Sequence, residues 1–353
     1  MYVPKYSITN LVLKNIGAIE AAKEMVDSAP LVPFYEKQFK TEALARQVHH
    51  GTHIEGNDLS LSQTKKVLEG EDIFGKDRDI QEVINYRNVM NLLDELVNRE
   101  GPYQVQDLLN IHRSTVEKIV PEEKIGVRKT QVLIKEEGTG KVILSPPPFV
   151  EVQFLLNDFF KWLNSPETRE IHPVIKAGIV HYVLVAIHPF VEGNGRAIRA
   201  FATLVMYREG YNVKRFFALE EHFDQDLADY YEALAKVDKI SPNIIERDLT
   251  SWLEYFTQVV AVELEKIKEK VKKISVDSHL KGRLGKQVAL TERQMKLVEY
   301  LSENNSGIMR DLTQILSMVS EDTVLRDLKD MMEKGIIRKE GSTKASRYYL
   351  IGK

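Results

Sequence analysis

The feature that most constrains this chain is the stretch His188-Pro-Phe-Val-Glu-Gly-Asn-Gly-Arg196, which joins two strongly patterned segments. The apolar residues 179–187 before it predict a buried helix or strand, and their number does not decide between the two. Pro189 should end that element, because proline lacks an N–H and disfavours helix in the residue before it. From Arg196 to Met206, apolar residues recur at helical spacing. The stretch is therefore expected to be a turn that leads into a helix.

The same stretch carries the groups that bind phosphate. Gly193, Asn194 and Gly195 can form a turn with positive φ angles, so that successive backbone N–H groups converge on one anion. That anion would lie at the N-terminus of the next helix, where free N–H groups and the helix dipole favour negative charge. Arg196 and Arg199 are three residues apart and project from one side of the first turn. Together they could bind two phosphates of one polyphosphate.

Two more side chains in the stretch suit this chemistry. Glu192 supplies a hard carboxylate oxygen of the kind that Mg²⁺ prefers. His188 can accept a proton from an attacking hydroxyl. Each residue alone would more often be structural, but the fixed spacing of all of them favours a phosphate site. The chain lacks the Gly-x-x-x-x-Gly-Lys-Ser/Thr pattern, so the P-loop nucleotide fold is not expected.

The pattern His-Pro-Phe-x-Glu-Gly-Asn-Gly-Arg-x-x-Arg of residues 188–199 resembles the signature of Fic-domain proteins, which are mostly protein adenylyltransferases. The resemblance implies a mainly α fold, a Fic-type helical bundle with a β-hairpin flap. It implies that the protein uses ATP and Mg²⁺ to transfer AMP to a hydroxyl on a protein. In that reaction His188 would be the general base and Glu192 would hold Mg²⁺.

The resemblance also gives roles to the other signature residues. Gly193, Asn194 and Gly195 would form the phosphate-binding nest, and Arg196 and Arg199 would contact the outer phosphates. The Doc branch of the family, which transfers phosphate itself, typically has Lys where this chain has Gly195. The glycine therefore favours AMP transfer.

A second segment, Ile54-Glu-Gly-Asn57, resembles the inhibitory helix of Fic proteins that carry an inhibitory segment near the N-terminus. In those proteins the glutamate, here Glu55, pairs with the second signature arginine, here Arg199. The outermost phosphate of ATP then lacks its cation. The family usually has Ser or Thr four residues before the glutamate, where this chain has Gly51. The alternative is that residues 55–58 are an ordinary polar helix end.

Residues 126–135 and 141–145 are β-prone and are separated by the turn-forming residues 136–140. This arrangement resembles the Fic flap, a hairpin over the active site. In the family the flap pairs through its backbone with the segment that carries the target hydroxyl. The resemblance implies that a protein substrate, which could be the chain itself, docks on residues 126–145. An ordinary surface hairpin is the alternative.

Tyr230 and Tyr231 resemble an aromatic pair that Fic proteins often place beside the adenine of ATP. A flat ring can stack on a base. Aromatic residues on helices more often pack in the core, and one of the two tyrosines could do so here.

The composition sets broader limits. The net charge of −3 gives no general attraction to nucleic acid, and the absence of cysteine excludes disulfides and cysteine-bound metals. The N-terminus lacks the pattern of a signal peptide, and the chain has no apolar run of about 18 residues. A cytoplasmic protein without a membrane segment is expected.

The chain is long enough for two or three domains. The predicted parts are an N-terminal helical region with the inhibitory helix (1–100), a Fic catalytic core (101–260), a helical linker (261–289) and a separate C-terminal domain (290–353).

In the C-terminal domain, residues 291–302, 309–316 and 320–334 are predicted to be helical, and residues 336–350 read as strand, turn and strand. This order resembles a winged helix-turn-helix, whose third helix would enter the major groove of DNA. Its basic residues could contact phosphates, but acidic residues on the third helix oppose DNA binding. The alternatives are a docking module or a homodimer interface.

Two classes of function remain open. The first is an autoinhibited, Mg²⁺- and ATP-dependent protein adenylyltransferase. The second is a winged-helix DNA-binding regulator whose Fic core only modifies itself or senses nucleotide. A third alternative is a hydrolase that removes AMP from proteins, in which Glu55 would align a water molecule.

Overall fold

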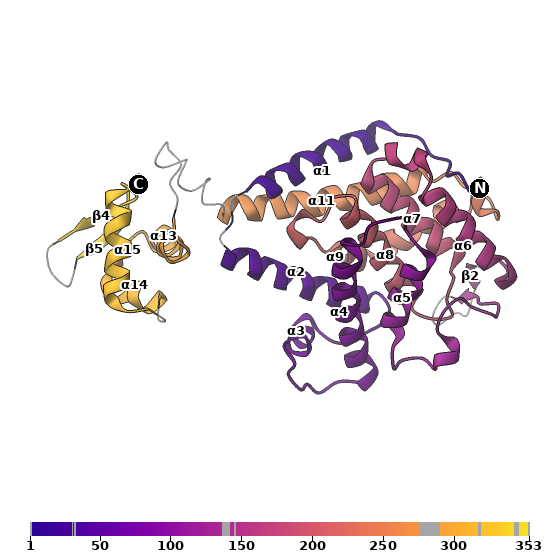
Figure 1. Ribbon diagram of the computed structural model, residues 1–353, viewed down its shortest axis with the longest axis horizontal. Coiled ribbons are helices and arrows are strands. Elements are labelled where there is room, and N and C mark those ends of the chain that lie inside the picture. Colours follow the sequence, from indigo (N-terminus) through magenta and orange to yellow (C-terminus); the bar gives the residue numbers. More distant parts are fainter. Residues whose placement is uncertain are drawn as a thin grey trace. The chain divides into compact units, whose positions relative to one another are not determined.

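The computed structural model describes residues 2–29, 31, 33–135, 142–144, 146–274, 290–316, 319–341 and 346–351. The chain forms two compact units (Figure 1). One consists of residues 1–23 and 40–266, and the other of residues 24–39 and 267–353. The finer domain limits expected from the sequence stay predictions.

As predicted, the fold is mainly helical. The α-helices up to residue 274 are, in chain order, α1 (Asn10–Ser28), α2 (Pro33–His53), α3 (Leu61–Glu69), α4 (Asp77–Val97), α5 (Val105–Val116), α6 (Phe149–Leu163), α7 (Pro173–Ile187), α8 (Asn194–Arg208), α9 (Leu219–Gln225), α10 (Leu227–Asp238) and α11 (Thr250–Ile274). Short 3₁₀ turns lie at Glu122–Lys124, Pro166–Glu170, Val213–Arg215 and Ile244–Glu246.

The core of the first unit is built around α7, whose residues are buried on almost every face. The apolar run 179–187 is therefore helix and not strand, since a helix satisfies its own backbone hydrogen bonds in an apolar core. Gly178 lets α11 approach closely, because a Cβ there would lie 2.9 Å from Leu253 Cδ2. Trp252 of α11 donates a 2.7 Å hydrogen bond from Nε1 to the Gly178 carbonyl.

Helix α8 follows α7 after a short loop, and the two helices pack against each other. Helices α4 and α5 pack on α8 as well, and α3 packs on α4 (Figure 1). This arrangement brings side chains of α4 and α5, which lie about a hundred positions upstream, against the first turn of α8.

Two short antiparallel strands, β1 (Ile134–Lys135) and β2 (Val142–Leu144), lie where the flap is predicted. The predicted turn at 136–140 lies outside the described residues, as do Lys141 and Ser145. The small sheet agrees with a flap.

The C-terminal part contains α13 (Glu292–Asn304), β3 (Gly307–Ile308), α14 (Met309–Ile315), α15 (Glu321–Glu333), β4 (Ile337–Glu340) and β5 (Arg347–Leu350). The strands form an antiparallel sheet in the order β3-β5-β4. Thr291 caps α13 through Gln294, as its position predicted, and Gly335 follows α15 with φ 72°. The two-residue strand β3 was not expected from the sequence, and the assignment to the winged-helix class stays a prediction.

Apolar side chains from the three helices and from β4 and β5 form one core. Its buried members are Leu297, Val298, Leu301, Leu312, Leu316, Val324, Leu328, Met331, Ile336, Ile337, Tyr348 and Leu350.

The described part of the chain contains no helix with the length and apolar character needed to cross a membrane.

Candidate active site

The signature begins where α7 ends. His188 adopts a left-handed conformation with φ 50°, and Gly193 does so with φ 77° immediately before α8. The side chain of Asn194 spans the loop between them: its Oδ1 accepts from the Phe190 N–H at 3.0 Å, and its Nδ2 donates to the Phe190 carbonyl at 2.9 Å. The Asn194 carboxamide therefore fixes the loop, and any role in phosphate binding is left to the backbone.

A histidine that the sequence analysis did not select supports the same loop. His112 of α5 stacks on Phe190, with ring centroids 3.7 Å apart and an interplanar angle of 11°. Burial lowers the pKa of His112 to about 4, so the ring is neutral at physiological pH. The Gly126 N–H donates to its Nδ1 at 3.3 Å, so Nε2 carries the proton and donates to the Glu192 carbonyl at 3.0 Å.

Arg128 holds the start of the loop from the flap side, and it was also missed. Its backbone N–H donates to the Pro189 carbonyl at 2.8 Å, and its Nε donates to the His188 carbonyl at 2.8 Å. Its Nη2 donates to the Pro147 carbonyl at 2.6 Å. This buried guanidinium thus joins both ends of the flap segment to the signature loop.

The imidazole of His188 is neutral. Burial and the nearby Arg128 guanidinium lower the pKa of His188 to about 4. Its Nδ1 is buried and has no hydrogen-bond partner among the described residues. An unprotonated ring is the form that a general base requires.

Arg199 and Glu55 form an ion pair. Arg199 Nη2 donates to Glu55 Oε1 at 2.8 Å and to the Gly51 carbonyl at 3.0 Å, and the arginine is 3% exposed. Burial alone would raise the pKa of Glu55, but the charges of Arg199 and Arg196 hold that pKa below its usual value. The carboxylate is therefore ionised.

The Glu55 carboxylate also lies against the start of α8. A Cβ on Gly195 would overlap Glu55 Oε1, so only glycine leaves room for the carboxylate at this point. The negative charge lies beside the helix N-terminus, where an anion is favoured. Glu55 thus occupies the region in which the sequence predicts a phosphate.

The Gly51 position, where the family usually has Ser or Thr, has a physical explanation. A Cβ on Gly51 would overlap the ring of Tyr86 from α4. Tyr86 is fully buried and donates from its hydroxyl to Glu220 Oε1 at 3.0 Å. The neighbouring Thr52 donates its hydroxyl to the Val48 carbonyl at 2.9 Å, so it does not replace a hydroxyl at 51.

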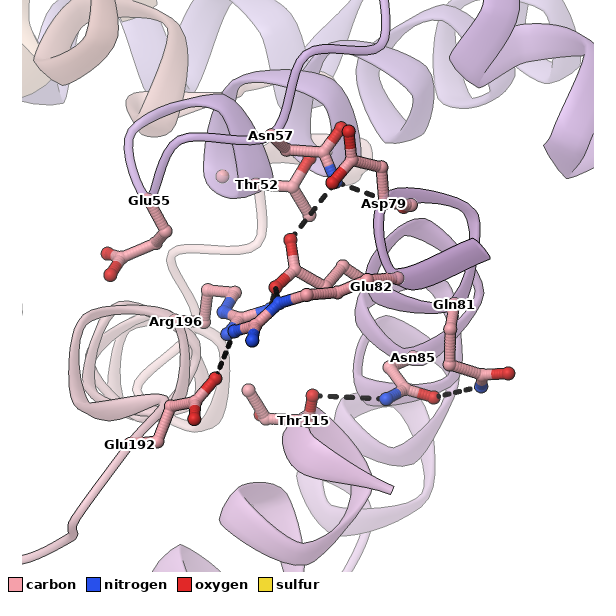
Figure 2. A network of polar contacts seen from close by, with 12 residues as sticks. Thr52, Glu55, Asn57, Asp79, Gln81, Glu82, Asn85, Thr115, Glu192 and Arg196 are labelled. Carbon is pink, nitrogen blue, oxygen red and sulfur yellow. Dashed lines mark hydrogen bonds and ion pairs between the residues drawn. The ribbon is translucent and has the colours of Figure 1, made fainter. Parts of the chain in front are cut away.

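The first signature arginine and the expected Mg²⁺ ligand both meet α4 (Figure 2). Arg196 is 2% exposed, and its Nη1 lies 3.1 Å from Glu82 Oε1. Glu192 accepts a hydrogen bond from Arg78 Nη2. Neither Arg78 nor Glu82 was selected from the sequence.

The two tyrosines of the predicted adenine pair differ in burial. Tyr230 is 2% exposed, packs on Phe223 with ring centroids 4.7 Å apart, and has its hydroxyl 3.2 Å from His181 Nε2. Tyr231 is 49% exposed. Tyr230 is therefore the one that packs inward, and Tyr231 is the ring of the pair that a ligand could reach.

The described residues contain no group of three or more His, Asp or Glu side chains arranged to hold a metal ion. Glu192, within the signature turn, offers a partly exposed carboxylate. A single carboxylate suits Mg²⁺, which commonly binds through one or two carboxylates together with the phosphates of its substrate.

The signature lies in a region that matches a known protein family. The Fic/DOC family model matches residues 102–206, which include the whole signature. "Protein adenylyltransferase Fic" of Aedes aegypti is 32% identical over 207 residues, which are 58% of this chain and 40% of the relative. "Protein adenylyltransferase fic-1" of Caenorhabditis elegans is 38% identical over 168 residues, which are 46% of this chain and 32% of the relative. The chain thus carries a Fic domain and spans less than half the length of these relatives.

Solved structures show the same fold. A Fic family protein from Desulfovibrio desulfuricans superimposes with a TM-score of 0.66 and 24% identity over 100% of this chain and 99% of the other. Fic-1 from C. elegans superimposes with a TM-score of 0.58 and 28% identity over 73% and 72% of the two chains.

Proposed function

We propose that this chain is an autoinhibited protein adenylyltransferase that uses ATP and Mg²⁺. The observation that carries the proposal is the position of the Glu55 carboxylate against Gly195 and Arg199. A carboxylate paired with a buried arginine already lies where the signature would bind phosphate. The relatives named as protein adenylyltransferases support the same chemistry.

In the proposed reaction, the hydroxyl oxygen of a target side chain attacks the α-phosphorus of ATP. The hydroxyl proton passes to His188, the bond from the α-phosphorus to the bridging oxygen breaks, and pyrophosphate leaves. The backbone N–H groups of 193–195 and the guanidinium groups of Arg196 and Arg199 bind and orient the phosphates. Glu192 would hold Mg²⁺, which neutralises phosphate charge when it is bound.

The proposed inhibition follows from charge. While Arg199 is paired with Glu55, it cannot bind the outermost phosphate, and the Glu55 carboxylate repels an incoming triphosphate at the helix N-terminus. Triphosphate in the productive pose therefore requires Glu55 to move. The ring of Tyr231 is proposed to lie beside the adenine.

The protein substrate is proposed to dock on the flap, residues 126–145, by adding a strand to it. Arg128 supports this role because it ties both ends of the flap segment to the backbone at His188 and Pro147. A substrate strand paired with the flap would therefore be held at a fixed position relative to the proposed general base, His188.

The C-terminal part is proposed to be a winged-helix module. Its helix α15 exposes Glu321, Asp322 and Glu333, which favours a protein partner, such as a second copy of the chain, over DNA. DNA binding remains the weaker alternative.

Incubation of the full chain with ATP labelled at the α-phosphate tests the proposal. Glu55→Gly should raise labelling of the chain or of an added target by about 5- to 150-fold over the wild type. Glu55→Gly with His188→Ala should return labelling to background. If Glu55→Gly instead abolishes a release of AMP from modified protein, the de-AMPylating hydrolase is the correct function.

A further inference from the structure

Glu82 lies at the centre of the polar network on α4 (Figure 2). Its side chain is 5% exposed. Its Oε1 lies 3.1 Å from Arg196 Nη1 and accepts from Arg78 Nε at 3.3 Å. Its Oε2 accepts from Asn57 Nδ2 at 3.1 Å. One buried carboxylate therefore contacts the first signature arginine and the segment that carries Glu55.

Arg196 has little else to fix it. Among the described residues, its Nε and Nη1 are buried without a hydrogen-bond partner, so the 3.1 Å contact with Glu82 is a charge pair without hydrogen-bond alignment. Buried donors of this kind cost free energy unless a ligand pairs with them. The unpaired N–H groups indicate that Arg196 is held ready for an anion, and Glu82 is the acid that holds it.

The other oxygen of Glu82 serves a different contact. Asn57 is 2% exposed, and its Nδ2 donates to the Asp79 carbonyl at 3.0 Å as well as to Glu82. Its Oδ1 accepts from the Leu59 N–H at 3.1 Å. Removal of the Asn57 side chain would thus break one contact of Glu82 and leave its pair with Arg196 in place.

We propose that Glu82 is a positioning residue that holds the guanidinium of Arg196 in place to bind the outer phosphates of ATP. This inference rests on the proposed function, because it takes the signature turn as the phosphate site. Glu82 itself touches no substrate; it acts through Arg196. A flexible arginine side chain binds phosphate well only when its planar head is oriented beforehand.

The test measures binding, so it does not depend on AMP transfer. Full-length protein with Glu55→Gly is titrated with adenosine 5′-(α,β-methylene)triphosphate and Mg²⁺ in a calorimeter, and separately with AMP. The methylene bridge prevents cleavage between the α- and β-phosphates. Glu82→Ala should weaken triphosphate binding roughly tenfold and leave AMP binding unchanged, because AMP lacks the outer phosphates. Glu82→Gln keeps the shape without the charge and should give a similar loss, because the contact with Arg196 is a charge pair.

Two controls separate positioning from a general structural role. Asn57→Ala, which spares the pair with Arg196, should change triphosphate affinity by less than about twofold. In an Arg196→Ala background, Glu82→Ala should cause no further loss. The proposal is overturned if Glu82→Ala weakens AMP and triphosphate equally, or if its effect persists without Arg196.

The outcomes also distinguish this inference from the proposed function. Triphosphate binding that depends on Glu82, without any AMP transfer, would support the positioning role and contradict the adenylyltransferase. No triphosphate binding to the Glu55→Gly protein would overturn both. Should Glu82→Ala fail to fold, as judged by its melting temperature, Glu82→Gln gives the deciding comparison.

Discussion

Two regions differ in how far their charged side chains are buried: the signature corner, which comprises residues 188–199 and the side chains that contact them, and the C-terminal module, residues 290–353. At the signature, Arg196 and Arg199 have side chains 3% exposed, and each meets an acid, Glu82 or Glu55. In the C-terminal module, Arg338 and Glu340 pair with both side chains more than half exposed, and Lys334 and Asp330 pair with both side chains partly exposed. Buried charges are costly without partners, whereas exposed pairs contribute little. The buried set therefore points to a particular chemistry, and the exposed set leaves several functions open.

The largest effect is expected from replacing His188, the proposed general base. His188→Ala in the Glu55→Gly protein should lower AMP transfer by about 10²- to 10⁴-fold, because His188 is the proposed acceptor of the hydroxyl proton. Binding of the methylene triphosphate should change little. Steady-state labelling and calorimetry on the same preparation measure both. Transfer that survives the substitution would remove His188 from the mechanism.

A smaller effect is expected where α2 meets α4. Gly51→Ala should lower the free energy of unfolding by roughly 1–3 kcal/mol, because the added methyl overlaps the Tyr86 ring. Gly17→Ala is the matched control: Gly17 is also helical, and a Cβ there meets no atom within 4 Å. That control should be neutral or stabilising by up to about 1 kcal/mol. Equal melting temperatures for the two variants would contradict the close packing of Gly51 on Tyr86.

The C-terminal module should be insensitive in the same assay. Arg338→Glu with Lys339→Glu reverses two exposed charges of β4, so AMP transfer by the Glu55→Gly protein should stay within about twofold. A gel-shift titration with mixed-sequence duplex DNA should show weak binding that these changes do not abolish. Tight binding that the reversal eliminates would favour the DNA-binding regulator.

The smallest expected effect is that of pH. Burial and Arg128 lower the pKa of His188 to about 4. The imidazole therefore stays unprotonated as the pH falls to about 5, and its capacity to accept a proton is lost only near its folded pKa. AMP transfer by the Glu55→Gly protein should therefore vary by less than about twofold between pH 6 and 8. A rate that halves near pH 6.5, the ordinary value for histidine, would show that His188 is not buried in this way.

The two regions also differ in how much the sequence could predict. The signature residues are contiguous, so their spacing alone indicated a turn, a helix N-terminus and the phosphate-binding side chains. The pairing of Glu55 with Arg199 was predicted through family resemblance, and the structure has that contact at 2.8 Å. Its inhibitory effect stays a prediction.

The supporting residues could not be found in the same way. Arg78, Glu82, His112 and Arg128 lie between 60 and 114 positions from their partners in the signature. They reach these partners only because α4, α5 and the start of the flap segment pack there. The single signal was chemical: a buried arginine of the signature requires an acid. The sequence offers many acids, and only the packing selects Glu82.

In the C-terminal module the sequence predicted the fold but not the function. Helical periodicity, the Thr291 cap and the glycine after α15 were sufficient to predict its helices, and the strand, turn and strand pattern of residues 336–350 predicted β4 and β5. These signals did not indicate a function. They identify the residues that form the core of the module. A binding partner would instead be selected by exposed residues on its surface.

A crystal structure of the Glu55→Gly protein with Mg²⁺ and adenosine 5′-(α,β-methylene)triphosphate tests the central claim most directly. The account predicts phosphate oxygens on the backbone N–H groups of 193–195, with Arg199 freed to bind the outermost phosphate and the His188 ring beside the α-phosphorus. A triphosphate bound elsewhere, with this corner filled by protein side chains, would contradict it.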